Sequence, residues 1–236
     1  MKDIGKGDEA HNEQLTPHSW QGARSIGLAH QLNEQFIELC CELALDAASG
    51  SQIPLVAAHR DLWSRLDQTS RQRLSLFPFV IVDLRFGDAT WWHIATHKGA
   101  QARGHFAATV PEARWAWLAL ETLMFGWQVA REDRVVATML FAMPPPVVDR
   151  IAALTMQQVR MLSVESAKFV RLRWDNDSRF WRELLIAARE LDESKMDVLR
   201  REAELHFCGE LIQASFSHNA VMPLVSEGRI DSAQKH

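Results

Sequence analysis

Cysteine is scarce in this chain of 236 residues, and long apolar runs are missing. Three cysteines, two of them adjacent, give no disulfide framework, so Cys40 and Cys41 are predicted to be small buried residues. No run approaches the roughly 20 apolar residues that a membrane helix needs. The polar N-terminus also lacks the apolar centre of a signal peptide. These absences predict a cytoplasmic protein without a membrane span.

The sequence signatures of several enzyme classes are absent as well. No serine lies in a G-x-S-x-G turn, and no glycine-rich loop that could hold a phosphate occurs. The missing phosphate loop argues against a nucleotide-binding enzyme. We therefore expect a non-enzymatic protein with no catalytic residues, no bound metal and no cofactor.

Two histidines support an alternative hypothesis, a small metal hydrolase. His93 and His97 lie four residues apart on a predicted helix, with His105 further on, so two imidazoles could face one metal. A hydrolase of that type needs a glutamate directly after the first histidine as general base, and Ile94 stands there. Histidines packed or exposed beside aromatic residues are the simpler interpretation.

The composition, with 47% apolar and 24% charged residues, is that of an ordinary globular protein. Apolar spacing predicts a mainly α fold, a helical bundle with a helix-turn-helix-like segment and one or two short strands. The best strand is 78–86, which carries three successive β-branched residues. We expect a flexible tail over 1–27, an added helical layer with a short strand over 28–110, a helical core over 111–217, and a disordered tail over 218–236.

The most informative stretch is Met139 to Asp175. Pro145 and Pro146 can open a short helix, because a proline at the first helical position loses no helical hydrogen bond. A second helix can start at Thr155, whose hydroxyl can accept from the backbone while Gln158 reaches back to complete a capping box.

After this second helix the pattern changes to that of a strand. Apolar residues from Phe169 to Trp174 alternate with basic ones, so a short strand with a basic, exposed side is predicted. Between Arg150 and Arg182, seven basic residues oppose three acidic ones, whereas the whole chain has a net charge of −4. A basic face of this size could contact DNA phosphates, although a solvated face of mixed charge is the simpler interpretation.

These residues resemble the FlhD family of flagellar transcriptional activators. The resemblance rests on Ile151 to Thr155, on Gln158 and Leu162, and on the Arg173-aromatic-Asp175 end of the strand, and it covers about 116–190. It implies a dimeric activator that acts on DNA with an FlhC-like partner subunit. The cysteine that links two subunits in many family members corresponds here to Val170, so no disulfide-linked dimer is implied.

Nine tryptophans and no tyrosine are the remaining peculiarity. On the helix predicted from Pro111 to Arg131, apolar residues spread around more than one face, which favours a second chain. We therefore expect a homodimer. The predicted dimer interface comprises Trp115, Trp117, Met124 and Trp127.

The sequence thus predicts a transcriptional regulator that reaches DNA through a dimer and a partner subunit. The alternative is an adaptor of the same fold that does not contact DNA. The predicted phosphate contacts are Arg160, Lys168, Arg171 and Arg173.

Overall fold

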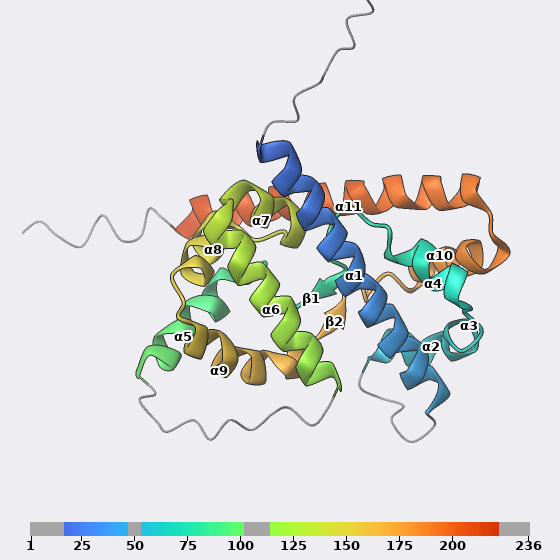
Figure 1. Ribbon diagram of the computed structural model, residues 1–236, viewed down its shortest axis with the longest axis horizontal. Coiled ribbons are helices and arrows are strands. Elements are labelled where there is room, and N and C mark those ends of the chain that lie inside the picture. Colours follow the sequence, from blue (N-terminus) through green and yellow to red (C-terminus); the bar gives the residue numbers. More distant parts are fainter. Residues whose placement is uncertain (1–16, 47–52, 102–113, 222–236) are drawn as a thin grey trace, which may run out of the picture.

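The computed structural model describes residues 17–46, 53–101 and 114–221, and Figure 1 shows how their elements are arranged. The predicted mainly α fold is confirmed. The helices are α1 Pro17–Leu45, α2 Pro54–Ala58, α3 Arg60–Trp63, α4 Gln68–Ser75, α5 Ala89–Gln101, α6 Arg114–Glu132, α7 Arg134–Phe141, α8 Pro145–Ala152, α9 Met156–Ser166, the 3₁₀ turn η1 Ala167–Phe169, α10 Ser178–Glu190 and α11 Glu193–Val221. Two short strands, β1 Val82–Asp83 and β2 Arg171–Leu172, pair in antiparallel orientation.

Both terminal helices extend into the segments predicted as tails. α1 begins at Pro17, so residues 17–27 are helical, and α11 continues to Val221. Proline at the first helical position does not oppose such a start, because its missing N–H would have had no partner in the helix. The remaining parts of the two predicted tails, 1–16 and 222–236, lie outside the described residues.

Side chains at the helix starts define the local boundaries. Asp67, Asp133 and Asp177 each accept a hydrogen bond from a backbone N–H in the first turn of the following helix. The capping box predicted for Thr155 and Gln158 is confirmed, since the threonine side chain accepts from Gln158 N while the Gln158 side chain accepts from Thr155 N. Such caps satisfy N–H groups that have no partner within the helix.

The strands are shorter than the runs 78–86 and 169–174 that were predicted. The backbone N–H and C=O groups just before β1 form hydrogen bonds with the Asn33 side chain and with the end of α7 instead of with a neighbouring strand. Asn33, which is fully buried on α1, donates to Phe79 O and accepts from Ile81 N, while Val80 N donates to Leu140 O. A buried backbone needs partners, and these contacts supply them without a third strand.

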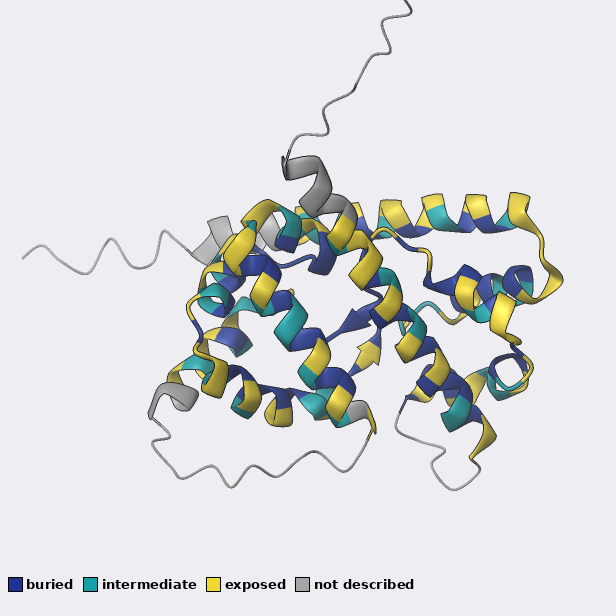
Figure 2. Ribbon diagram, in the orientation of Figure 1, coloured by how far each residue is buried: buried dark blue, intermediate teal, exposed yellow. Residues whose placement is uncertain are grey.

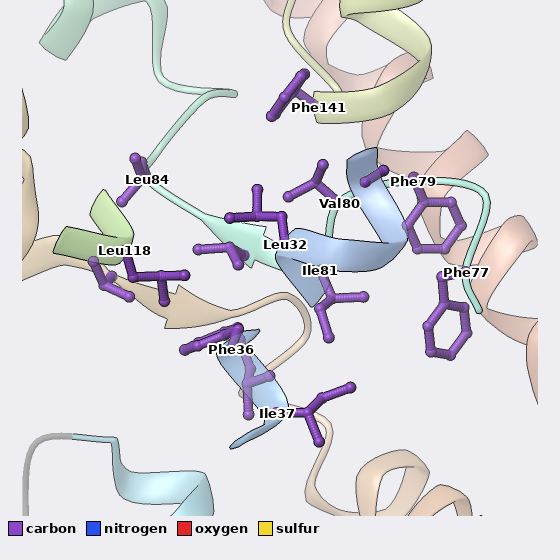
Figure 3. Packing of buried hydrophobic residues seen from close by; sticks show 14 of the residues in the cluster. Leu32, Phe36, Ile37, Phe77, Phe79, Val80, Ile81, Leu84, Leu118 and Phe141 are labelled. Atoms are coloured by element: carbon purple, nitrogen blue, oxygen red, sulfur yellow. The ribbon is translucent and has the colours of Figure 1, made fainter. Parts of the chain in front are cut away.

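The core is one cluster of apolar side chains that draws on both the predicted layer and the predicted core. Figure 2 shows the helices with their buried faces turned inward and their exposed faces outward. Figure 3 shows Leu32, Phe36 and Ile37 of α1 gathered with Ile81 and with Leu118 of α6. Both residues of β1 are therefore buried beside α1 and α6, whereas β2 has one buried and one exposed residue.

Helices from the two parts of the chain are interlocked. α5 packs against α8 and α9, whereas α10 packs against α3 and α4. Residues 28–110 therefore do not lie as a separate layer over 111–217, because each part supplies a helix to the packing of the other.

Candidate functional surface around the strand pair and helix α9

A cleft of about 680 Å³ opens beside the strand pair. Its walls come from the turn after β1, from η1 and β2, and from α11. The lining includes three of the four predicted phosphate contacts, Lys168, Arg171 and Arg173, together with Arg85. Carboxylates also line it, so the electrostatics depend on how the charges pair.

Arg171 is paired with Asp83 of the opposite strand. Its Nε and Nη2 donate to Oδ2 of Asp83 at 2.8 and 2.7 Å, and the aspartate side chain is 9% exposed. Burial by itself would lower the pKa of the Arg171 guanidinium, but the charge and hydrogen bonds of Asp83 raise it overall. Arg171 thus faces the cleft with its charge already matched.

Arg173 is buried, contrary to the expected basic exposed side of this strand. Its side chain is 3% exposed, and it donates to Val80 O at 2.7 Å, Phe141 O at 2.5 Å and Glu210 Oε2 at 2.5 Å. The guanidinium also lies over the ring of Phe207. Every side of this cation is occupied within the fold, so we remove Arg173 from the predicted phosphate contacts. Arg173 N still donates to Ile81 O, so the backbone pairing continues to this residue while its side chain reaches buried acceptors.

The cleft as a whole is close to electrically balanced. Arg85 pairs with Asp88 at 2.7 Å, in addition to the two arginine–carboxylate pairs described above. Lys168 lies over the Phe169 ring on the rim, and Asp175 lines the same cleft. Four cations therefore meet four carboxylates here, and a charge-balanced cleft gives an anion no net electrostatic attraction.

The outer face of α9 is more open than the cleft, and it carries Glu165 as well as basic residues. Arg160 is exposed, with Gln157 and Val164 beside it at helical spacing, and Lys168 follows four residues after Val164 in η1. The opposite face of α9 is apolar, with Val159 and Leu162 buried. Two of the four predicted phosphate contacts thus lie on one exposed face.

The predicted interface residues have three different placements. Trp117 is 44% exposed on α6. Met124 and Trp127 are partly buried against the core, and Trp127 Nε1 donates to Leu154 O at 2.9 Å. The side chain of Trp115 lies outside the described residues. Among the described residues, Trp117 is therefore the tryptophan of this set that a second chain could still cover.

The two histidines of α5 lie side by side, but in the described segments they have no further ligand. The rings of His93 and His97 are 4.5 Å apart and exposed. No group of three histidine, cysteine, aspartate or glutamate side chains in those segments could hold a metal. His105 lies outside the described residues.

The sequence interpretation missed the carboxylates that neutralise the basic segment. Asp83 and Glu210 lie 88 and 37 residues from the arginines that they bind. No local pattern marks such partners, because a local charge count includes only the residues inside its own window. The local excess of basic residues therefore overstated the charge that reaches the surface.

Comparison with protein families, curated proteins and solved structures finds no match to this chain. In the parts of the chain that the structure describes, no single helix is long and apolar enough to cross a membrane. α7 and α8 pass that test together only as a pair bent by 115°.

Proposed function

We propose that this protein is a non-enzymatic transcriptional regulator that works in a protein complex and places the outer face of α9 against DNA. The proposal rests on one observation. α8, a short turn and the capped helix α9 follow one another in the order of a helix-turn-helix segment, with Arg160 exposed on the second helix and Lys168 exposed just after it. Exposed cations on such a helix are suited to contact phosphates.

The same geometry limits how much DNA affinity this chain supplies. Arg171 and Arg173 are bound by carboxylates of the protein, so two exposed cations remain of the four predicted. Each neutralised phosphate contributes about one unit to the salt dependence of binding, so a two-cation face binds weakly by itself. An FlhC-like partner subunit, which the resemblance implies, would supply the rest of the DNA contact.

The test compares DNA retention across a salt series for the wild type and for Arg160→Ala combined with Lys168→Ala. The double variant should bind more weakly at low salt, and the slope against salt should fall by about one unit per lost contact. Arg179→Ala combined with Arg189→Ala is the matched control, because it removes the same charge from exposed positions on α10. If both double variants lose DNA retention equally, the loss comes from the lower net charge and not from α9, which would contradict the proposal.

A second candidate is an adaptor that contacts a protein partner but no DNA. The charge balance of the cleft favours the adaptor, because three cations of the cleft already form ion pairs with carboxylates of the protein. An adaptor predicts no salt-dependent retention by the wild type, either alone or in complex with its partner. Salt-dependent retention that needs Arg160 and Lys168 distinguishes the regulator from the adaptor.

A further inference from the structure

Two stretches of the chain repeat the same order of local structure. The first runs through α3, α4, β1 and α5, and the second through α8, α9, β2 and α10. In each, a short helix leads through a capped turn into a second helix, then a two-residue strand and a third helix, and the second stretch adds the 3₁₀ turn η1 before its strand. Asp83 of β1 and Arg171 of β2 lie 88 residues apart, and an offset of 88 aligns the two stretches as far as the strands, although β2 begins one residue later in its stretch than β1 does.

The second helix of each stretch is built by the same contacts. Asp67 caps α4 and Thr155, 88 residues later, caps α9, each by accepting from the N–H three residues on. Ser75 Oγ donates to Gln72 O in the first stretch. In the second stretch Ser163 Oγ donates to Arg160 O, and these residues are again 88 positions further along.

The third helix repeats an aspartate cap and a hydrogen bond from a tryptophan ring. Asp88 and Asp177 cap α5 and α10 by accepting from Trp91 N and Phe180 N, each three residues on. The offset is 89 here, so the second stretch has one extra residue between its strand and its third helix. The residue after each of these two donors is a buried tryptophan. The indole Nε1 of the first tryptophan donates to Arg85 O at 3.1 Å, and that of the second donates to Arg173 O at 2.9 Å.

The strand register relates the two stretches by a two-fold axis. When a two-fold axis passes through an antiparallel strand pair, the residue on the axis lies opposite its own equivalent, and the residue before it lies opposite the equivalent of the residue after it. Asp83 and Arg171 are equivalent by the 88-residue offset, and they are register partners. Val82 pairs with Leu172, the equivalent of Leu84, as the same axis requires.

The helices follow this axis as well. α4 packs against α10 of the other stretch, and α9 packs against α5 of the other stretch. α1 and α6, which precede the two stretches, contact each other and run in opposite directions across the front of the molecule (Figure 1). Each stretch therefore gives its third helix to the other.

We infer that this chain is a pseudo-dimer of two diverged copies of one unit, and that the Asp83–Arg171 contact on its axis selects the pairing of unlike copies. Two identical copies would place like charges opposite each other at this point, which is unfavourable. In this chain the opposed residues carry opposite charges and meet in a two-pronged hydrogen bond. A single chain thus forms the two-stranded pairing that two identical copies would otherwise form as a dimer.

The two copies present unlike outer faces. Arg160 is exposed on α9, whereas its equivalent on α4, Gln72, is exposed and uncharged. A partner that binds both helices therefore contacts an arginine on α9 and an uncharged glutamine at the equivalent position of α4. This difference allows the partner to bind the pseudo-dimer in one orientation. This asymmetry does not depend on whether the partner is DNA or protein.

The test exchanges charges in the full-length chain. Asp83→Arg and Arg171→Asp each place like charges opposite each other and should lower the melting temperature by roughly 5 °C. Both changes in one chain restore an opposite pair, so the double variant should melt above Asp83→Arg and remain the same size as the wild type. The loss that remains is expected from the hydrogen bond that Asp83 accepts from Phe86 N. As a control, Arg134 and Asp149 form an ion pair of the same 2.7 Å length that is exposed on both sides, and reversing either charge should have little effect.

Refolding the two single variants together adds a readout that a merely local ion pair would not give. If the copies are interlocking units, two chains can exchange them, so that the arginine introduced at position 83 of one chain meets the aspartate introduced at position 171 of the other. The mixture should form a 1:1 dimer that melts near the wild type. No recovery in the double variant, or no mixed dimer after joint refolding, would overturn the inference.

Discussion

Arg173 and Glu210 join the strand pair to the last helix by a charge-assisted hydrogen bond of 2.5 Å. Arg173 also satisfies two carbonyl oxygens, Val80 O and Phe141 O, so one side chain holds three separate segments together. Removing one member of a buried ion pair costs far more than removing an exposed charge, because the remaining polar groups lose their partner.

Arg173→Met should therefore lower the free energy of unfolding by about 3 kcal/mol or more, measured by urea denaturation. Arg179→Met is the matched control, because the Arg179 side chain is 89% exposed and its change should stay within about 0.5 kcal/mol. Similar stability for both variants would contradict a structural role for Arg173.

Arg173 also illustrates what the sequence could and could not predict. Helix starts were predictable where the chemistry is local, as at Thr155 with Gln158 and at Asp177. The burial of Arg173 was not, because it depends on Phe141 and Glu210, which lie outside the strand. Period-two alternation placed its side chain on the exposed side, beside that of Arg171. The backbone pairing continues to Arg173, whose N–H donates to Ile81 O, but the guanidinium reaches buried acceptors that other segments supply.

The internal pairing of β2 escaped prediction for a related reason. The resemblance to FlhD-type proteins covered residues about 116–190 and named no partner for the predicted strand. The structure pairs that strand with β1, which lies near residue 82 in the part that the resemblance did not cover. Sequence periodicity finds a strand but says nothing about its partner, so the interlocked arrangement appeared only in three dimensions.

The cap of α9 provides a second prediction. Thr155→Ala removes the acceptor for Gln158 N and should lower the free energy of unfolding by about 1 kcal/mol. Thr155→Ser keeps a hydroxyl and should recover most of this loss. A Thr155→Ala variant with wild-type stability would show that water replaces the cap without cost.

The equivalent cap of α4 predicts a pH dependence. The hydrogen bond from Ser70 N holds the pKa of the Asp67 carboxyl below its ordinary value. A lowered pKa in the folded state means that ionised Asp67 stabilises the fold above the unfolded pKa, and that this stabilisation is lost as pH falls through the folded pKa. The wild type should exceed Asp67→Asn in stability at pH 7, and the difference should shrink below roughly pH 4. Asp61→Asn, an exposed change on α3, serves as control in the same denaturation series, and a constant difference across this range would exclude the cap charge as its source.

Two tryptophans of α6 allow the effects of a substitution on stability and on association to be measured separately. Trp127→Phe removes the hydrogen bond to Leu154 O and should lower the melting temperature without changing the sedimentation behaviour. Trp117→Glu alters a half-exposed side chain and should leave the melting temperature nearly unchanged. If α6 forms the predicted homodimer, Trp117→Glu alone should shift sedimentation from dimer toward monomer. The same sedimentation profile for wild type and Trp117→Glu would end the case for a dimer through this helix.

Thiol labelling offers a prediction that depends on the core itself. Cys40 and Cys41 are buried on α1, and Cys208 is exposed on α11. Burial raises the pKa of Cys40 and raises that of Cys41 to about 11, so at pH 8 only about a thousandth of Cys41 is the reactive thiolate.

An aromatic disulfide reagent should therefore modify one thiol quickly in the folded protein and all three in urea. Cys208→Ser should abolish the fast reaction and leave the slow one unchanged. Two fast thiols in the folded wild type would mean that α1 does not stay packed against α4 and α6, and the pseudo-dimer, which needs that packing, would not hold together as described.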